Sequence, residues 1–383
     1  MTIAINKERL ASTFTTLCEI DSPSKREGNI SKWLQKTFAD LGADLIYEDN
    51  SASKTGSESG NLIICFNGNQ PQTEGLFFSC HMDTVEPANG VQVVRKGDIF
   101  TSKGDTILGG DDKSGIAAIL ELLQLLKENN SSHPMIEIII TTCEEIGLLG
   151  AKHLEFDKLQ SSYGYALDST GINHVVVGAP AANKINVVVK GQAAHAGLCP
   201  EAGINALSIA VTALNSVKIG RLDEESTSNF GLIEGGVAAN IIPEKIILKG
   251  EVRSHNKKKL QRYTNEIKTA FDNAIAGWQP TTETKDQQPE VAVSIVADYP
   301  ALSIHSDAPV LQRLKKGADA VQKDIKHIVA GGGSDANIFC NKGLQTAIIA
   351  TGMDKVHTID EQLDLGDLTS LTELLLGIVT TPV

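Results

Sequence analysis

Residues 75–83 read GLFFSCHMD, and this stretch joins a short apolar run directly to a histidine and an aspartate. Short, nearly continuous apolar runs are typical of strands that are buried on both faces of a parallel sheet. Ligands and catalytic groups collect at the carboxyl ends of such strands. The stretch therefore predicts a central strand with His81 and Asp83 at the functional edge of the sheet, although an H-x-D triplet alone occurs by chance in many proteins.

Apolar runs and helical stripes alternate on either side of this stretch. Residues 135–141 (MIEIIIT) and 163–167 repeat the pattern of a buried strand. Residues 114–127 have the apolar spacing of a helix with one buried face, and further helices are expected at residues 7–17 and 31–41. This alternation indicates an α/β sheet with helices on both faces.

The pattern changes after Pro180. Residues 184–190 (KINVVVK) alternate apolar and polar side chains, as a half-exposed antiparallel strand does. A helix, two strands, a second helix and a last strand are expected to follow, and this β-α-β-β-α-β order is the split ferredoxin-like pattern. We therefore expect an α/β fold in which a mixed-sheet domain (1–180 and 299–383) carries an inserted smaller α+β ferredoxin-like domain (181–298).

Composition narrows the classes of function. The formal net charge is −13 and only 4% of the residues are aromatic, which argues against nucleic acid as a partner. The six cysteines are scattered without a C-x-x-C pair, as expected in a reducing compartment. The N-terminus lacks the apolar core of a signal peptide, and no apolar run reaches the length of a membrane span. We therefore expect a cytoplasmic protein without a membrane partner.

Further acidic residues and one more histidine occur in other motifs. The acidic residues follow predicted strands or lie at the start of a predicted helix. Asp111 lies in LGGDDK, Glu144 and Glu145 lie in TCEEIG, and Asp168 follows YAL. His357 comes late, in GMDKVHT. Each motif alone has a simpler explanation, since aspartates are favoured as helix caps and adjacent glutamates are usually solvated. Together they are the mixture of imidazole and carboxylate that zinc prefers.

The order of these motifs resembles the co-catalytic zinc exopeptidase superfamily, which includes peptidase T, carboxypeptidase G and the aminoacylases. The resemblance covers nearly the whole chain and includes GQAAHAG at residues 191–197 and GGGSD at residues 331–335. It implies a catalytic domain that binds two divalent metal ions, usually zinc, with cobalt or manganese as alternatives. It also implies that the smaller domain acts as a lid and pairs two subunits, so a homodimer is expected.

The resemblance implies a role for each residue that matches a metal ligand. Asp111 would bridge the two metal ions. His81 and Asp168 would complete one metal site. Glu145 and His357 would complete the other.

The remaining matched residues would act on the substrate or on the ligands. Asp83 would orient the ring of His81 through its second nitrogen. Glu144 would be the general base that takes a proton from water and later gives it to the leaving amine. The residues expected to contact the substrate are His195, Asn240 and Arg253, of which the last would grip a carboxylate with two hydrogen bonds.

Asp168 also bears on the choice of substrate. By resemblance, aminopeptidases and dipeptidases of the superfamily carry Asp at this position, whereas deacylases and carboxypeptidases mostly carry Glu. The chain looks similar to peptidase T-like proteins, although His81 and Asp111 are only 30 positions apart (111 − 81), fewer than in peptidase T itself. We expect a tripeptide aminopeptidase-like enzyme that acts on short peptides. A deacylase or carboxypeptidase acting on N-acyl amino acids stays open, as does, more distantly, a non-catalytic binding protein with the same fold.

Overall fold

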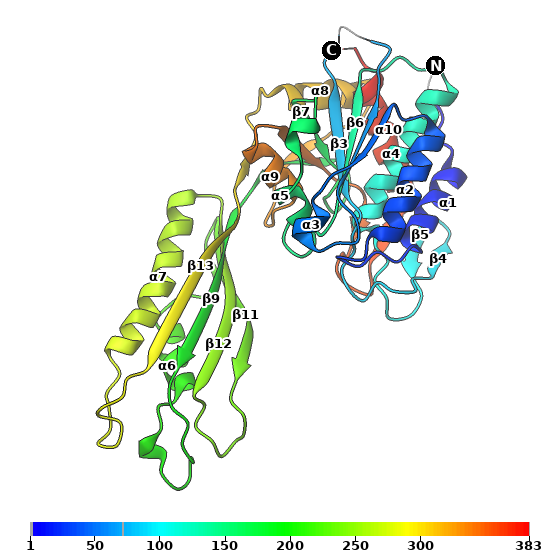
Figure 1. Ribbon diagram of the computed structural model, residues 1–383. Coiled ribbons are helices and arrows are strands. Elements are labelled where there is room, and N and C mark those ends of the chain that lie inside the picture. Colours follow the sequence, from blue (N-terminus) through cyan, green and yellow to red (C-terminus); the bar gives the residue numbers. More distant parts are fainter. Residues whose placement is uncertain (1–2, 71–72, 383) are drawn as a thin grey trace. The chain divides into compact units, whose positions relative to one another are not determined.

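The computed structural model describes residues 3–70 and 73–382, and the chain divides into two compact units. The larger unit contains the described residues of Met1–Gly178, Leu302–Ala330 and Ser334–Val383. The smaller unit contains Ala179–Ala301 and Gly331–Gly333 (Figure 1). The chain therefore builds most of the smaller unit in one excursion and returns to it briefly with Gly331–Gly333.

The larger unit is built on a nine-stranded sheet. Its strands are β1 (Leu45–Glu48), β2 (Leu62–Phe66), β3 (Leu76–His81), β6 (Ile136–Thr141), β7 (Tyr163–Ala166), β8 (His174–Ala179), β14 (Leu302–Ser303), β15 (Lys326–Val329) and β16 (Gln345–Ile349). The order is β1-β2-β6-β3-β7-β16-β8-β14, and β15 pairs with β8. Strand β3 is parallel to both β6 and β7, and β16 is parallel to β7, whereas β2 runs antiparallel to β6. The predicted mixed α/β sheet is confirmed.

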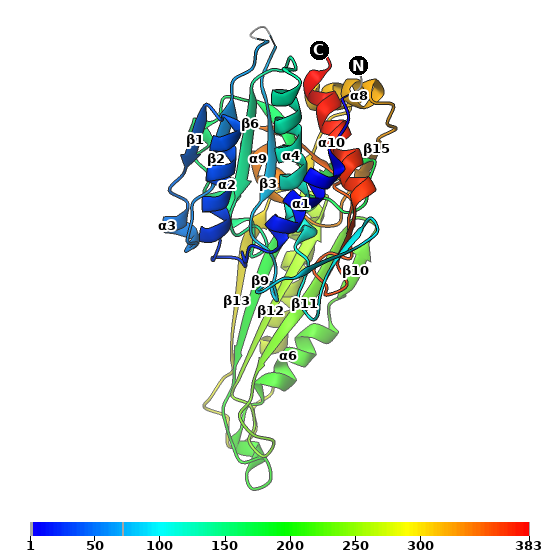
Figure 2. The same cartoon turned by 90° about the vertical axis from the view of Figure 1, so that its right-hand side faces the viewer.

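Helices cover both faces of this sheet. On one face lie α1 (Lys7–Cys18), α2 (Gly28–Leu41), α4 (Gly110–Glu128), α8 (Pro309–Ala320) and α10 (Leu365–Thr380) (Figure 2). On the other lie α3 (Ala52–Thr55), α5 (Leu149–Lys152), α9 (Asp335–Asn341) and the 3-10 turn η1 (Phe156–Lys158). Across the described part of the chain, no helix combines the length and the apolar character that crossing a membrane requires.

Strand β3 is buried along its whole length because both faces of the sheet are covered. Phe78 stacks on Tyr165 with ring centroids 5.9 Å apart, and the hydroxyl of Tyr165 donates to the carbonyl of Val310 in α8 at 2.8 Å. On the opposite face Phe77 meets Phe339 of α9, edge to face, at 5.9 Å. Successive side chains of a strand point to opposite faces, so a continuous apolar run is what two covered faces require.

A separate four-stranded sheet connects two distant parts of the chain. Its strands are β4 (Val93–Lys96), β5 (Ile99–Ser102), β17 (Met353–Asp354) and β18 (Gln362–Asp364), in the order β17-β18-β5-β4. All of its pairs are antiparallel. His357 lies in the loop between β17 and β18, so this sheet holds the late histidine beside the segment that precedes α4.

The smaller unit contains one antiparallel sheet with helices against it. Its elements are β9 (Ala181–Lys190), η2 (Pro200–Ala202), α6 (Ala206–Asn215), β10 (Gly220–Asp223), β11 (Ser226–Gly235), β12 (Lys245–Ser254), α7 (Lys257–Ala276) and β13 (Glu290–Tyr299). The strand order is β10-β11-β12-β9-β13, so a short strand, β10, is added to the expected pattern. Ile185, Val187 and Val189 are buried while the residues between them are more exposed, which is the alternation that the sequence predicts.

Candidate metal centre

Three parallel strands end at the same edge of the nine-stranded sheet. His81 is the last residue of β3, and in the register of the two strands it pairs with Thr141, the last residue of β6. Glu144 and Glu145 follow β6 directly, and Asp168 comes two residues after the end of β7. Because the strands are parallel, their carboxyl ends bring these side chains to one edge of the sheet.

Asp111 lies at the centre of the cluster. Its Oδ1 is 3.1 Å from Nε2 of His81, and its Oδ2 is 3.2 Å from Nε2 of His357. The same nitrogen of His357 is 3.2 Å from Oε2 of Glu145. Burial works to raise the pKa of Asp111, but hydrogen bonds from the two histidines outweigh it and lower that pKa. One carboxylate therefore faces two imidazoles with its two separate oxygens, as a bridging ligand does.

A second carboxylate, Glu361, holds the backbone that presents Asp111. It accepts hydrogen bonds from the N–H groups of Gly109 at 2.7 Å and of Asp111 at 3.0 Å. Gly109 has a φ of 79°, a conformation that favours glycine. The peptide bond between Asp111 and Asp112 is cis. The side chain of Glu361 is fully buried, and burial raises its pKa to about 7. Glu361 was not predicted from the sequence, where its only signal is its position four residues after His357.

Asp83 lies directly behind His81. Its backbone carbonyl oxygen is 2.9 Å from Nδ1 of His81, and its Oδ1 is 3.4 Å from the same nitrogen. The carboxylate also accepts from the N–H of Glu144 at 2.9 Å and from the hydroxyl of Ser24 at 2.6 Å. In the tautomer that donates from Nδ1, the Nε2 of His81 is free to bind a cation, and Asp83 fixes both that ring and the turn that carries Glu144.

Glu144 is buried among other carboxylates. Burial raises the pKa of Glu144 well above its usual range, although the nearby His81 opposes this effect. The charges of Asp168 and Asp335 raise it further. A carboxylate whose pKa is raised holds a proton more readily than a solvated carboxylate does, as a general base requires.

Two further aspartates face the same cluster. Burial raises the pKa of Asp168, and the charges of Asp111 and Glu145 add to that rise. Asp335, the first residue of α9, is buried and accepts a hydrogen bond from the hydroxyl of Thr141. From the sequence, Asp335 is only the last residue of the motif GGGSD, because its burial is a tertiary feature.

The side chains of His81, Asp111 and Glu145 are suitable ligands for a divalent cation. Ligand atoms of His81, Asp111 and Glu145 all lie within 4.8 Å of one another. Oε1 of Glu145 is buried and has no hydrogen-bond partner among the residues that the structure describes. A buried carboxylate oxygen without a partner is costly unless a cation or an ordered water satisfies it. Imidazole nitrogen and carboxylate oxygen are also the ligands that zinc takes.

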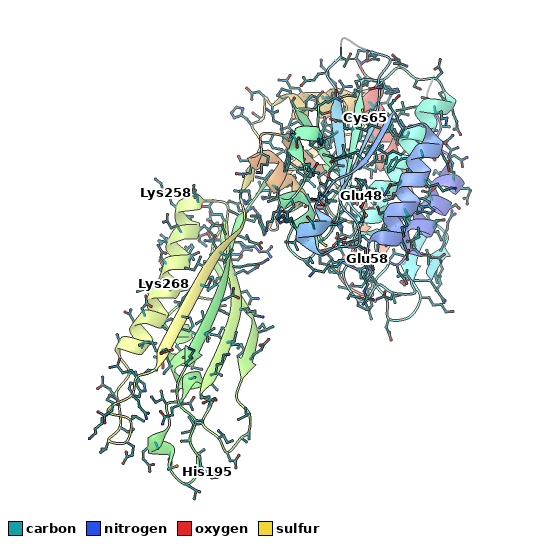
Figure 3. The ribbon with its side chains drawn as sticks, in the orientation of Figure 1. Glu48, Glu58, Cys65, His195, Lys258 and Lys268 are labelled. Carbon is teal, nitrogen blue, oxygen red and sulfur yellow. The ribbon has the colours of Figure 1, made fainter. Side chains whose placement is uncertain are left out.

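In the smaller unit, the loops that carry His195 and Asn240 lie next to each other. The N–H of Ala196 donates to the carbonyl of Asn240 at 2.9 Å. The ring of His195 is exposed at the looped end of the unit (Figure 3), and its Nδ1 accepts from two backbone N–H groups of its own loop at 3.2 Å each. Nε2 is therefore the protonated nitrogen, which is available as a hydrogen-bond donor.

Arg253 lies at the other end of the same sheet. In the register of β12 with β9, Lys245 pairs with Lys190, whereas Arg253 pairs with Ala182. His195 follows β9 just beyond Lys190. Arg253 lies eight residues along β12 from Lys245 (253 − 245), which is a distance of roughly 26 Å in a strand. The smaller unit therefore does not bring His195 and Arg253 together.

The guanidinium of Arg253 is held along one edge. Its Nε and Nη2 donate to the two carboxylate oxygens of Glu251 at 2.8 and 3.1 Å. Its Nη1 points toward the glycine loop, and a Cβ added to Gly332 would lie 3.5 Å from it. The edge that Glu251 leaves free has the geometry for the carboxylate contact expected from the sequence.

Known proteins resemble this chain over most of its length. The sequence model of the family described as Peptidase family M20/M25/M40 matches residues 77–381. The uncharacterized protein YqjE of Bacillus subtilis strain 168 is 38% identical, over 98% of each chain. Among solved structures, the aminopeptidase PepT from Bacillus cereus ATCC 10987 is 36% identical with a TM-score of 0.86, over 98% of each chain. A tripeptidase from Staphylococcus aureus subsp. aureus Mu50 is 34% identical with a TM-score of 0.90, again over 98% of each chain.

Proposed function

We propose that this chain, which belongs to peptidase family M20/M25/M40, is an aminopeptidase for short peptides. It would work with two bound metal ions. The family is the one that the order of the sequence motifs indicates. The full-length similarity to the PepT aminopeptidase and to the tripeptidase supports action at the N-terminus of a short peptide.

One observation carries the two-metal proposal: Asp111 presents one oxygen to His81 and the other to His357. His81, Asp168 and Asp111 would hold one ion, and His357, Glu145 and Asp111 would hold the other. Zinc is the proposed metal, and cobalt or manganese are the alternatives because they accept the same nitrogen and oxygen donors.

The chain's own residues would move the proton in this reaction. Two bound divalent ions supply Lewis-acid chemistry, which polarises the scissile carbonyl and makes a water molecule more acidic. Glu144 would accept a proton from the attacking water and would then pass it to the amine that leaves. Asp83 keeps Glu144 in place through the hydrogen bond that it accepts from the Glu144 backbone.

The substrate contacts are proposed to come from two subunits. Arg253 would hold the free carboxylate of the peptide with the guanidinium edge that Glu251 leaves open. His195 would donate from Nε2 to a carbonyl oxygen of the substrate. Since roughly 26 Å of strand separates the ends of the sheet where His195 and Arg253 lie, we propose that one substrate meets Arg253 of one subunit and His195 of the other. The protein would then be a homodimer.

The direction of cleavage separates the candidate activities. With zinc present, we expect Leu-Gly-Gly to give free leucine and Gly-Gly, and we expect N-acetyl-Leu-Gly-Gly to remain intact because its amine is blocked. Chromatography of the products with time is the measurement. Free glycine as the first product would indicate a carboxypeptidase, and release of acetate from N-acetyl amino acids would indicate a deacylase. Turnover of none of these compounds would favour a binding protein.

Mixing two inactive variants tests the shared site. We expect His195→Ala and Glu144→Gln to be inactive alone and to regain activity when their subunits are exchanged, because the first variant keeps its own Glu144 and receives His195 from its partner. A mixture of Glu144→Gln with Asp111→Asn is the control, since both changes damage the same metal centre in each chain, and it should stay inactive. Absence of recovery after light scattering has shown dimers that exchange subunits would rule out a shared His195.

A further inference from the structure

The turn that follows β6 carries Glu144 and Glu145, and side chains from three other segments hold its backbone. Four successive N–H groups of the turn donate hydrogen bonds to side-chain oxygens. The acceptors are Asn61 for Thr142 at 3.1 Å, Glu27 for Cys143 at 3.0 Å, and Asp83 for Glu144 and Glu145 at 2.9 and 3.3 Å. Asp83 belongs to the proposed metal centre, whereas Glu27 lies between α1 and α2, outside the residues that the family model matches. The N-terminal part of the chain therefore contacts this turn directly.

Cys143 is the residue of the turn with an unusual backbone conformation. Its φ is 53°. Because of the β-carbon, this left-handed conformation is uncommon for residues other than glycine, and it persists where the surroundings determine it. Cys143 immediately precedes Glu144, so its conformation sets the direction in which the chain leaves β6. Whatever holds Cys143 in this conformation therefore also places Glu144.

The carboxylate of Glu27 accepts hydrogen bonds from both donors of Cys143. Its Oε1 lies 3.0 Å from the backbone nitrogen and 3.3 Å from the sulfur. Its Oε2 accepts from the hydroxyl of Ser57 at 2.5 Å, which fixes the orientation of the carboxylate. Glu27 has no exposed surface, so water does not compete for these bonds. A buried N–H that lost its acceptor would be costly, and Glu27 is therefore coupled to the conformation of Cys143.

The position of Glu27 at the start of α2 offers a different set of partners. It is the N-cap residue of α2, where short acceptor side chains usually bond to the first N–H groups of the helix. The side chain of Glu27 makes no such bond and turns toward Cys143 instead. Its backbone carbonyl accepts from the N–H of Ser31 at 2.9 Å. The helix therefore anchors the residue while the carboxylate holds the turn.

We propose that Glu27 is a positioning residue for the general base. It keeps Cys143 in the left-handed conformation and thereby keeps Glu144 in its buried position. The inference rests on the proposed function, since it takes Glu144 to be the base. The role of Glu27 depends on the reach of an acceptor oxygen and not on its charge, because both donors of Cys143 are neutral.

Two substitutions separate the reach of the oxygen from its charge. Glu27→Gln keeps an acceptor oxygen at the same distance from Cys143, and its amide nitrogen can donate to Ser57. Glu27→Asp keeps the charge but is one methylene shorter, and aspartate is a preferred N-cap residue, so this variant retains α2 and loses the hold on Cys143. We expect Glu27→Gln to keep the wild-type kcat for Leu-Gly-Gly. We expect Glu27→Asp to lower kcat by about 10–100-fold, the upper value being the loss that a misplacement of about 1 Å can cause, with KM and metal content unchanged.

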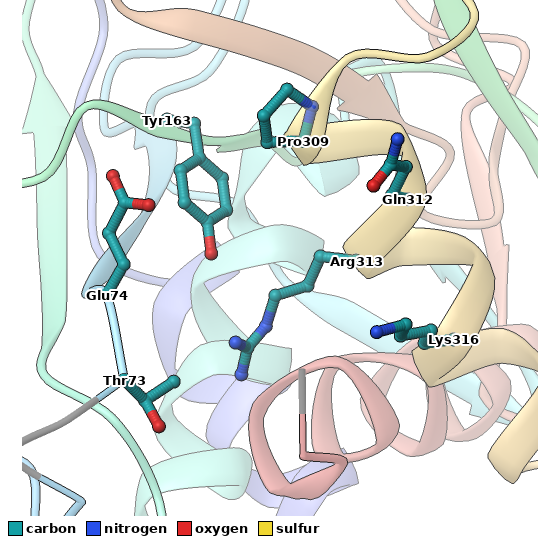
Figure 4. Close-up of a pocket in the computed structure, with 7 residues that line it drawn as sticks. All are labelled: Thr73, Glu74, Tyr163, Pro309, Gln312, Arg313 and Lys316. Atoms are coloured by element: carbon teal, nitrogen blue, oxygen red, sulfur yellow. The ribbon is translucent and has the colours of Figure 1, made fainter.

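Glu137→Asp is the matched control for this change. Glu137 is also a buried carboxylate that holds backbone, since it accepts from the N–H groups of Gln160 at 3.0 Å and Ser161 at 2.7 Å. It lies near the start of β6, at the opposite edge of the sheet from the metal centre. Figure 4 shows a pocket at that edge, lined by Tyr163 at the start of β7. Any general effect of shortening a buried glutamate is present in Glu137→Asp too, and its kcat should equal that of wild type.

Hydrogen exchange of the metal-free protein tests the inference without any turnover. We expect the amides of residues 142–145 to exchange about tenfold faster in Glu27→Asp than in wild type, as the loss of one hydrogen bond implies. Glu27→Gln and Glu137→Asp should exchange there as wild type does. Wild-type kcat and wild-type exchange in Glu27→Asp would overturn the proposal, and so would an equal loss of kcat in Glu27→Gln. If wild type cleaves no peptide, the proposed function fails, and the exchange rates alone decide whether Glu27 holds the turn.

Discussion

Replacing Glu144 by Gln is expected to lower kcat by about 10²–10⁴-fold, which is the usual contribution of a general acid–base residue. Glutamine has nearly the same size and can occupy the same buried position, but it cannot accept and return the proton of the attacking water. Asp83 holds the backbone N–H of residue 144, and this bond does not involve the side chain. The loss should therefore appear in kcat, with little change in the KM of a tripeptide.

The metal content of this variant supplies the control. Glu144 is not one of the proposed ligands, so metal analysis of the purified protein should find as many ions per chain in Glu144→Gln as in wild type. Near-normal kcat with a full metal load would exclude Glu144 as the base. Loss of the metal together with the activity would show instead that Glu144 is a ligand.

Asp111→Asn is expected to remove metal and activity together. The variant keeps the shape of the side chain but has one oxygen instead of two, and it loses the charge that both histidines face at 3.1 and 3.2 Å. Metal affinity should fall by more than the roughly 10–100-fold caused by losing a supporting contact to a ligand. Elemental analysis and the tripeptide assay on the same preparation measure both effects.

Asp105→Asn is a suitable comparison for this variant. Asp105 precedes α4 in the same segment and is exposed, so the change removes the same charge without touching the cluster. We expect its metal content and activity to match wild type. If Asp111→Asn still bound two ions and hydrolysed peptides at the wild-type rate, Asp111 could not be a bridging ligand.

The residues at the strand ends could be predicted because the apolar runs that identify the strands directly precede them in the sequence. The apolar runs before His81 and before Glu144 identify buried strands, and parallel strands bring the residues that follow them to one edge. Periodicity alone could not place His357, since it follows no long strand and is held by the small sheet that pairs β18 with β5. Its assignment came from the order of the family's motifs.

Glu361 and Asp335 could not be found from the sequence for a physical reason. Glu361 follows Asp360 in a stretch of acidic residues, and Asp335 ends a glycine-rich loop, so a solvated carboxylate would be ordinary at either position. What distinguishes both residues is burial against backbone or hydroxyl donors from distant segments. The distance between His195 and Arg253 also appears only once the register of β9 and β12 is known.

The most direct measurement of the central claim is anomalous X-ray scattering from crystals of the zinc-loaded protein. The account predicts two peaks per chain on either side of the Asp111 carboxylate, one within bonding distance of His81 and Asp168 and the other within bonding distance of Glu145 and His357. A fully active crystal form with one peak, or with two peaks that do not share Asp111, would contradict it.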